Sequence, residues 1–168
     1  EAETLRDSVL AASGLLNAKM GGPPVRVPIE KEVYDLIFTE GEPDNLWPLQ
    51  PDKTLQYRRS IYLLNKRTVR LPMLANFDQP DDMTSCPVRP ASTHSLQALS
   101  LMNSDFMHEQ SEAFASRLQT ACGADRTCAV KQAYQFALAR APRQNELELA
   151  RQFFDKDPSL ADFCLALL

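Results

Sequence analysis

The sequence contains little glycine and little histidine, and these two shortages exclude several kinds of active site. Its 168 residues include 5 glycines and 2 histidines. Closely spaced glycines are needed for a phosphate-binding loop and for a GxSxG nucleophile turn, and neither motif occurs. The stretch from Gly21 to Pro24 is instead typical of a helix stop. His94 and His108 have no metal-ligand spacing to another His or Cys, so we expect them to be surface or helix-cap residues.

Long hydrophobic runs and an excess of positive charge are also missing. No run of about 18 apolar residues occurs, so the sequence predicts no membrane span. The net charge is −4, and no basic stripe dominates, so a nucleic-acid partner is not expected. The CxxCH motif is absent, so this chain does not itself attach a c-type haem. We expect no bound metal and no cofactor in this chain.

Proline is abundant, and its distribution divides the sequence. Most of the 12 prolines precede residue 91, which indicates an irregular first half with long connections and a helical second half. Hydrophobic residues make up 44% of the chain, enough for a real core. We therefore predict a single all-α domain over residues 1–168, an irregular bundle of six to eight helices with a proline-rich, loop-rich first half. Both ends lie within helical patterns, so we interpret the chain as a fragment of a longer multidomain protein.

Apolar spacing locates the helices of the first half. Leu5, Val9, Ala12 and Leu16 form one stripe, which predicts a helix over residues 1–17. Further predicted segments are an extended piece over 25–28, a short helix over Val33, Leu36 and Ile37, a proline-rich connection over 42–52, and a loop over 72–90 with a turn of helix at 73–76. Residues 54–68 are expected to form a helix, although their apolar residues also fit a short strand.

Capping residues and breakers mark the second half. Ser92, Thr93 and Ser95 are candidate N-caps for a helix that runs to Met102. A cap at 103–105 precedes a predicted helix that ends at a C-cap at Gly123 and has four residues inward: Met107, Ser111, Phe114 and Leu118. A cap at Asp125 starts the next helix, which ends at a break at 141–142 and has Ala129, Ala133, Phe136 and Ala137 inward. A further helix runs through Leu147, Ala150 and Phe154, and the last helix is predicted to start at 157–158.

The chain has four cysteines, Cys86, Cys122, Cys128 and Cys164. Cys122 and Cys128 flank a short polar turn between two predicted helices, and a disulfide there would join the helix ends. Free thiols and a metal pair are the alternatives, although zinc needs more ligands than this stretch supplies. A disulfide would indicate an oxidising compartment.

The middle of the chain holds clustered charges. Asp78, Asp81 and Asp82 suit turns and ion pairs, and carboxylates at this density also occur in Ca²⁺ sites and acid/base sites. The basic cluster consists of Arg58, Arg59, Lys66, Arg67 and Arg70. We expect Arg58 or Arg59 to turn inward and pair with Asp78 or Asp81, because an unpaired buried charge is very costly. The functional alternative is a site for an anionic ligand.

Aromatic residues precede the acidic cluster. We expect Trp47, Tyr57 and Tyr62 to close the core over the proline-rich segment, and the alternative is an exposed platform for a sugar. An exposed, flat Trp47 would favour the platform.

The same central segment resembles a known family. RRSIYLLNKRTVRLPMLANFDQPDD, then SCPVR, then THSLQALSLMNS, are similar to motifs of the planctomycete secreted domain family (domain of unknown function 1553). ETLRDSVLAASGLLNAKMGGPPV resembles its entry helix, and QAYQFALARAPRQNELELA and ADFCLALL resemble its late helices. The matching signature positions are Arg58, Arg59, Ser60, Tyr62, Arg67, Phe77, Asp78, Pro80, Asp81, Cys86, Arg89, Gln97, Leu99 and Asn103.

This resemblance implies a setting rather than a reaction. Such domains lie at the C-terminal end of large exported bacterial proteins that often carry a c-type cytochrome module, which implies a periplasmic or cell-surface location and companion domains as partners. The resemblance supplies no catalytic residues, and the Cys122–Cys128 pair is outside its pattern. We therefore expect a non-catalytic helical scaffold or ligand-binding module. The alternatives are an enzyme domain acting on complex carbohydrate, with Asp78, Asp81, Arg58, Arg89 and His94 in its pocket, and a carbohydrate-binding module.

Overall fold

The computed structural model describes residues 1–29, 31–37, 46–156 and 158–168. These residues form eight α-helices and two short 3-10 helices, with isolated β-bridges in place of strands. No helix in this part of the chain combines the length and the apolar content needed to cross a membrane. In chain order the elements are α1 (Ala2–Ser13), α2 (Lys31–Ile37), η1 (Lys53–Tyr57), η2 (Ser60–Tyr62), α3 (Pro72–Asn76), α4 (Ser95–Asn103), α5 (Asp105–Cys122), α6 (Arg126–Leu138), α7 (Gln144–Lys156) and α8 (Leu160–Leu167). The predicted all-α fold is confirmed.

The chain divides into two compact units. The irregular unit contains Glu1–Asp7 and Leu16–Gln97, and the helical unit contains Ser8–Leu15 and Ala98–Leu168. Helix α1 contributes its first half to one unit and its second half to the other. The single domain predicted over residues 1–168 stays a prediction.

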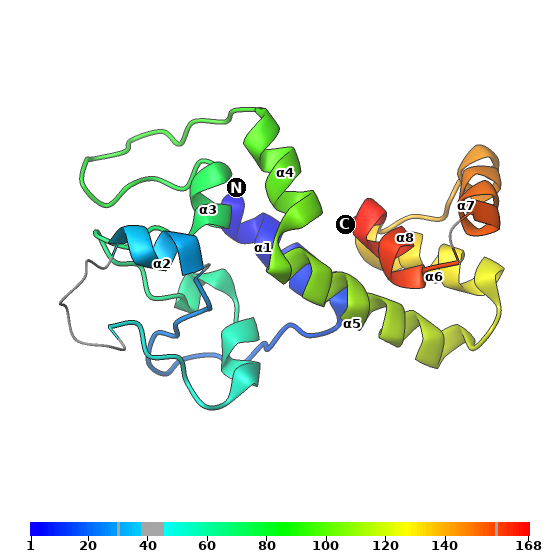
Figure 1. Ribbon diagram of the computed structural model, residues 1–168, viewed down its shortest axis with the longest axis horizontal. Coiled ribbons are helices and arrows are strands. Elements are labelled where there is room, and N and C mark those ends of the chain that lie inside the picture. The colour runs from blue at the N-terminus through cyan, green and yellow to red at the C-terminus, as the bar shows by residue number, and fades with distance from the viewer. Residues whose placement is uncertain (30, 38–45, 157) are drawn as a thin grey trace. The chain divides into compact units, whose positions relative to one another are not determined.

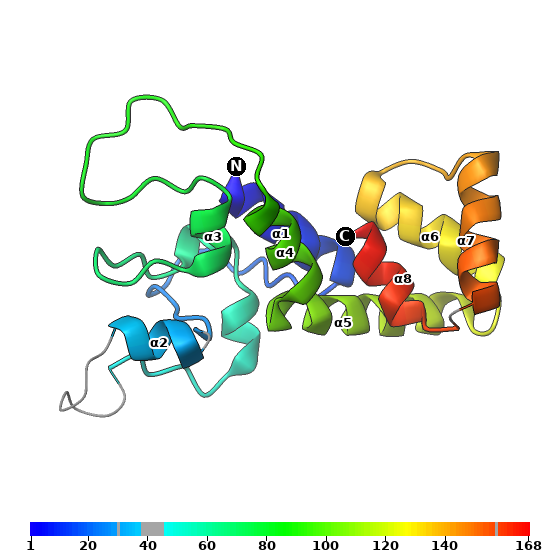
Figure 2. The same ribbon diagram turned by 45° about the horizontal axis from the view of Figure 1, so that its top comes forward.

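The helical unit has an apolar core. Helix α8 lies along α5 and α6, as both ribbon views show (Figures 1 and 2). Burial of apolar side chains is the main favourable term in such packing. The buried cluster consists of Phe114, Leu118, Ala129, Val130, Ala133, Ala150, Phe163 and Cys164. The predicted inward face of α5 is confirmed, because Met107, Ser111, Phe114 and Leu118 are all buried.

Capping residues mark the ends of these helices through local hydrogen bonds and backbone conformation. Ser104 accepts from the N–H of Met107 at the start of α5, and Asp125 accepts from the N–H of Cys128 at the start of α6. Gly123 ends α5 with φ +58°, a conformation that favours glycine. The last helix begins at Leu160 behind an N-cap at Ser159, later than predicted. Asp157, the predicted cap, lies outside the described residues.

Helix α1 ends earlier than its apolar stripe predicts. It stops at Ser13, and Gly14 follows with φ +85°. A glycine takes this backbone conformation without steric cost, so the helix ends here and not at Gly21. The Ser13 hydroxyl bonds the Leu10 carbonyl at 3.0 Å and the Gln110 side-chain oxygen at 2.8 Å, which are contacts within the helical unit.

The helix predicted over residues 54–68 is wrong. The turns η1 and η2 occupy its first part and are separated by extended backbone at Arg58 and Arg59. Distant segments take the backbone hydrogen bonds: the N–H of Asn17 donates to the Tyr57 carbonyl at 3.0 Å, and the N–H of Val25 donates to the Tyr62 carbonyl at 2.8 Å. Apolar spacing alone cannot distinguish such a strand-like segment from a helix.

Other predicted pieces of the irregular unit hold. Helix α2 covers Val33 and its neighbours, α3 is the turn of helix expected at 73–76, and Val25 is extended in a bridge to Leu63. The first part of the proline-rich connection, residues 42–45, lies outside the described residues.

Candidate ligand-binding cleft

Arg58 is buried and organises the irregular unit through backbone carbonyls. Its side chain is enclosed, with 2% of the residue exposed. Its Nη1 donates to the Pro23 carbonyl at 3.1 Å, and its Nη2 donates to the carbonyls of Lys19, at 3.3 Å, and Gly21. Its guanidinium stacks on the Tyr62 ring, 3.9 Å from the ring centre. The planar guanidinium suits both tasks, because its donors spread in one plane and its face packs on an aromatic ring.

Arg6 is a second buried arginine, and the sequence analysis missed it. Its Nη1 donates to the Arg58 carbonyl at 3.0 Å and to the Ser60 hydroxyl at 3.2 Å, and its Nη2 donates to the Gln56 carbonyl at 2.6 Å. Burial lowers the pKa of Arg6 to about 10, so it stays charged at neutral pH. Arg6 lies four positions after Ala2 and four before Leu10, and both of these residues are buried. This helical spacing is the sequence pattern that could have predicted its burial.

The predicted ion pairs between the arginines and Asp78 or Asp81 are wrong. Arg58 has the carbonyl partners just described, and Arg59, about half exposed, lies 3.9 Å from Asp7. Asp81 closes its own turn, accepting from the N–H of Met83 at 3.1 Å and from the N–H of Thr84 at 3.0 Å. Local turn hydrogen bonds thus occupy this carboxylate, and they lower its pKa.

Asp78 and Ser92 close the base of a long loop, residues 79–91, between α3 and α4 (Figure 1). The Asp78 carboxylate accepts from the Ser92 N–H at 2.7 Å and from the Ser92 hydroxyl at 2.8 Å, and these bonds lower its pKa. Asp78 has φ +62°, a left-handed conformation that aspartate tolerates better than most residues. Gln97 supports the same point, donating to the carbonyls of Asn76 at 3.0 Å and Ser92 at 3.1 Å.

A second contact holds the returning part of this loop. The Arg89 guanidinium donates to both carboxylate oxygens of Glu3, at 2.7 and 3.1 Å. This hydrogen bond from Arg89 is the main cause that lowers the pKa of Glu3. A two-point contact between guanidinium and carboxylate fixes direction as well as distance. The loop therefore meets the first turn of α1.

These contacts border an open cleft within the irregular unit. It has a volume of about 480 Å³, within the range typical of ligand sites, roughly 300 to 1,000 Å³. The first turns of α1, the end of α3, the loop and the start of α4 supply its walls. The lining residues are Glu1, Leu5, Phe77, Asp78, Arg89, Pro90, Ala91, Ser92 and Gln97.

Comparison with known proteins assigns a family. Residues 1–154 match PSD1, the family described as protein of unknown function (DUF1553). The chain belongs to this family. Neither a curated protein nor a solved structure matches the chain. Because the family description states no activity, the function of this DUF1553 chain must be argued from its own residues.

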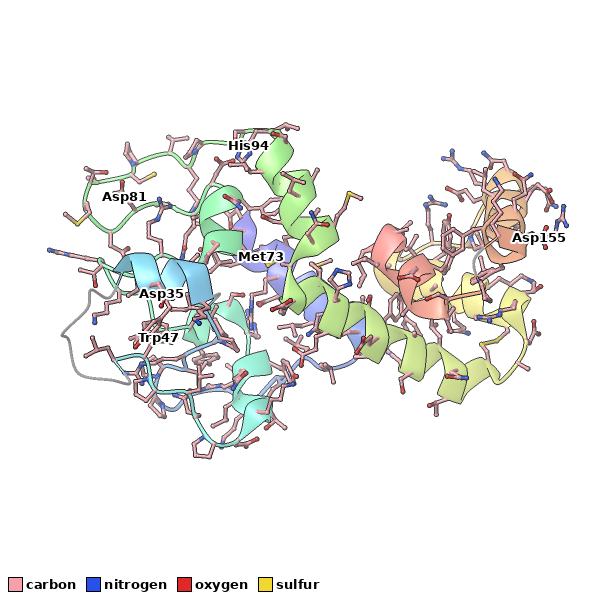
Figure 3. All side chains as sticks on the ribbon, viewed as in Figure 1. Asp35, Trp47, Met73, Asp81, His94 and Asp155 are labelled. Atoms are coloured by element: carbon pink, nitrogen blue, oxygen red, sulfur yellow. A yellow bond between two sulfur atoms is a disulfide. The ribbon has the colours of Figure 1, made fainter. Side chains whose placement is uncertain are left out.

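The DUF1553 chain brings together only part of the residue set predicted for a site. Asp78 and Arg89 line the cleft, whereas Arg58, Arg59, Asp81 and His94 do not. Figure 3 shows Asp81 on the loop and His94 where the loop meets α4, both exposed. The sequence analysis did not identify the partners of these two residues, which are Glu3 for Arg89 and Ser92 for Asp78.

The core role expected for Trp47 is confirmed, and the alternative of an exposed aromatic platform is wrong. Trp47 is 6% exposed, and its indole Nε1 donates to the Val27 carbonyl at 2.8 Å (Figure 3). Tyr62 lies under the Arg58 guanidinium, and its hydroxyl accepts from the N–H of Gly21 at 2.9 Å. These rings close the core of the irregular unit.

The predicted disulfide between two of the four cysteines is present. Cys122 and Cys128 form a disulfide, while Cys86 is an exposed free thiol and Cys164 a buried one. Burial raises the pKa of Cys164 to about 12, so its thiol is neutral and unreactive at neutral pH. Across the described ranges, no group of three or more His, Cys, Asp and Glu is arranged to hold a metal ion.

Proposed function

We propose that this DUF1553 chain is a non-catalytic helical module that binds a ligand in the cleft of the irregular unit. The supporting observation is that Asp78 and Arg89, two charged residues of the cleft lining, are held in structural hydrogen bonds. Asp78 holds Ser92, and Glu3 holds Arg89. Walls held in place by such bonds are suited to recognition.

Acid/base catalysis would need a different electrostatic arrangement. A general acid at neutral pH requires a carboxyl group whose pKa is raised toward 7, usually by burial or by a like charge. The pKa values of Asp78 and Glu3 are instead lowered, by Ser92 and Arg89 respectively. These groups are ionised hydrogen-bond acceptors at neutral pH and have no proton to give. The observation therefore favours binding over turnover.

The alternative was an enzyme acting on complex carbohydrate, and the residues predicted for its pocket do not come together. Asp81 serves its own turn and Arg58 is enclosed by carbonyls, so Asp78 and Arg89 are what remains of that set in the cleft. Arg89 in turn is neutralised by Glu3 at 2.7 Å. We do not favour this alternative.

We place this module in an exported, multidomain bacterial protein, at the periplasm or cell surface, with companion domains that include a c-type cytochrome. The Cys122–Cys128 disulfide supports an oxidising compartment. Exposed apolar side chains on α4, Leu99 at 50% and Met102 at 63%, support docking against a companion domain. Detecting the parent protein in periplasmic and cytoplasmic fractions tests the location, and a cytoplasmic pool with reduced cysteines would contradict it.

Binding is tested with a variant that fills the cleft. Ala91 lines the cleft and is exposed, so Ala91→Trp should occupy the space without disturbing the core. Val88 lies on the same loop at 82% exposure and does not line the cleft, so Val88→Trp is the matched control. The chain is screened by thermal shift against a broad set of metabolites and oligosaccharides. We expect at least one compound to stabilise the wild type and Val88→Trp but not Ala91→Trp.

The non-catalytic part of the proposal has its own test. Each compound that binds is incubated with the wild type and analysed by mass spectrometry for conversion. We expect no product. Turnover by the wild type that Asp78→Asn abolishes, with binding retained, would show that the chain is an enzyme. A screen in which no compound stabilises the wild type would overturn the binding proposal.

A further inference from the structure

We infer that the ligand of this cleft is a neutral carbohydrate of one or two rings, an inference that rests on the cleft being a binding site as proposed above. It follows from which hydrogen-bonding groups the structural contacts leave free, from the charge of the walls and from the apolar part of the lining. Each of these restricts the chemistry of the occupant independently.

The structural contacts leave mainly acceptors free in the cleft. Gln97 uses its amide N–H groups on the carbonyls of Asn76 and Ser92, and among the described residues nothing donates to its Oε1. In the part of the chain that the structure describes, Asp78 accepts from Ser92 alone, and an ionised carboxylate has about four acceptor positions, so some remain open. A ligand must therefore donate hydrogen bonds to this wall.

Arg89 adds the opposite requirement. Arg89 directs two of its N–H groups at Glu3. Because a guanidinium carries about five N–H groups, Arg89 has donors left for a ligand in the cleft. A ligand that fits both walls must donate and accept. Hydroxyl groups do both, whereas an ammonium group only donates and would leave the remaining N–H groups of Arg89 without an acceptor.

The charge balance argues against an anion. Asp78 is ionised, Arg89 is paired with Glu3, and the Glu1 side chain also lines the cleft, so the lining side chains together with Glu3 carry net negative charge. A carboxylate, phosphate or sulfate would have to approach the Asp78 carboxylate while Arg89, the cationic side chain of the lining, is already paired. The anionic ligand considered from the basic cluster therefore has no site here, because Arg58 is enclosed by carbonyls.

The remaining lining is apolar. Phe77 is half-buried at the end of α3, and Leu5 and Pro90 lie on the other walls. An aromatic ring has a negative face that attracts the slightly positive C–H groups of a sugar ring. A pyranose has this pattern, with a C–H face and a rim of hydroxyl groups. Together these features match a sugar better than a purely apolar or an ionic ligand.

The test compares sugars of similar size and different charge. Wild type is titrated with glucose, N-acetylglucosamine and cellobiose as neutral probes, glucosamine as the cationic probe and glucuronate as the anionic probe, followed by NMR chemical shifts. We expect at least one neutral sugar to bind, and Ala91→Trp to weaken it by at least about tenfold, whereas Val88→Trp leaves it unchanged. Phe77→Leu, which keeps an apolar wall but removes the ring, should weaken it about threefold to tenfold.

The alternative outcomes are distinct. Binding of glucosamine or glucuronate without any neutral sugar would overturn the inference, because the charge argument would be wrong. Neutral-sugar binding that persists in Ala91→Trp would overturn it as well, because the site would lie elsewhere. If no sugar binds but another screened compound does so through the cleft, the carbohydrate inference fails while the proposed binding function stands.

Discussion

The irregular and helical units are stabilised by different kinds of buried group. In the helical unit the core consists of apolar side chains around Phe114 and Leu118. In the irregular unit two arginines, Arg6 and Arg58, are buried and donate to main-chain carbonyls. Backbone outside helices and sheets leaves its carbonyls without local partners, and burying them unpaired is costly. A single guanidinium supplies several N–H donors at once. In the irregular unit it therefore pairs carbonyls that backbone N–H groups would pair within a helix.

The largest effect should come from the apolar core. Phe114→Ala in the helical unit removes a fully buried ring and should cost about 3–5 kcal/mol of unfolding free energy. The matched control is Leu149→Ala on α7, where the side chain is 62% exposed and the expected change is within about 0.5 kcal/mol. Urea unfolding followed by circular dichroism measures both. Equal effects of the two variants would contradict the core described here.

The corresponding change in the irregular unit is Arg58→Met. The carbonyls of Lys19, Gly21 and Pro23 lose their donor, and with about 1–3 kcal/mol for each unsatisfied buried group we expect a net loss of about 2–4 kcal/mol. Hydrogen exchange should rise in residues 16–64 and not in α5. Equal destabilisation of both units by Arg58→Met would contradict the role of this arginine as a contact of the irregular unit.

Arg59→Met is the control for this change. Arg59 is next in sequence but half exposed, and its nitrogen lies 3.9 Å from Asp7. A pair of this kind contributes about 1 kcal/mol or less. A larger loss than that of Arg58→Met would show that the exposed arginine, and not the buried one, organises this unit.

The same difference explains what the sequence could predict. Helix boundaries in the helical unit follow from residues a few positions apart, such as Ser104 with Met107, so the sequence predicts most of them, although α8 starts later than its proline indicates. In the irregular unit the deciding contacts are distant, since Arg6 reaches a carbonyl 52 positions away, at Arg58. Apolar spacing between Leu55 and Leu63 could not reveal them, so a helix was predicted there wrongly.

The candidate site was predicted in part for the same reason. Asp78 and Arg89 were recognised as charged residues of the central segment, and both line the cleft. Their partners, Ser92 and Glu3, were not, because a serine or a glutamate has no distinctive pattern of its own. Asp78 was assigned to an arginine because opposite charges attract, but a nearby backbone N–H satisfied its carboxylate instead.

Removal of the disulfide sharpens the comparison within the helical unit. Cys122 and Cys128 close a short loop, so replacing both with serine should cost about 2 kcal/mol by restoring chain entropy to the unfolded state. Cys86→Ser is the control, because this thiol is exposed and forms no disulfide, and a serine hydroxyl can keep its weak hydrogen bond to the Val88 carbonyl, so it should change little. An alkylating reagent should label Cys86 in the folded chain, whereas Cys164, whose pKa is raised to about 12 by burial, reacts after unfolding. Rapid labelling of Cys164 in the folded chain would contradict its place in the core.

Acid should produce the smallest effect, through surface carboxylates of the helical unit. Glu146 accepts from Arg140 at 2.7 Å and from the N–H of Arg143 at 2.6 Å, and these bonds lower its pKa from 4.5 to about 2. Because the folded pKa is the lower one, this contribution to stability is complete above about pH 4.5 and disappears as the pH falls toward 2. Glu146→Gln should therefore be less stable than wild type at pH 7, and the two urea midpoints should converge near pH 2.

Glu112→Gln, at an exposed position of α5, distinguishes this effect from a general loss of negative charge. Its urea midpoint should stay close to that of wild type at pH 7, because the exchange removes no hydrogen bond of the kind that Glu146 makes. If both variants lowered the midpoint at pH 7 equally, net charge and not the Arg140 contact would be responsible. The arginine-to-carbonyl contacts of the irregular unit should not follow the Glu146 curve, because guanidinium groups keep their charge throughout this range. Acid would then separate surface carboxylate contacts, such as that of Glu146, from the buried arginine-to-carbonyl contacts that Arg58→Met tests.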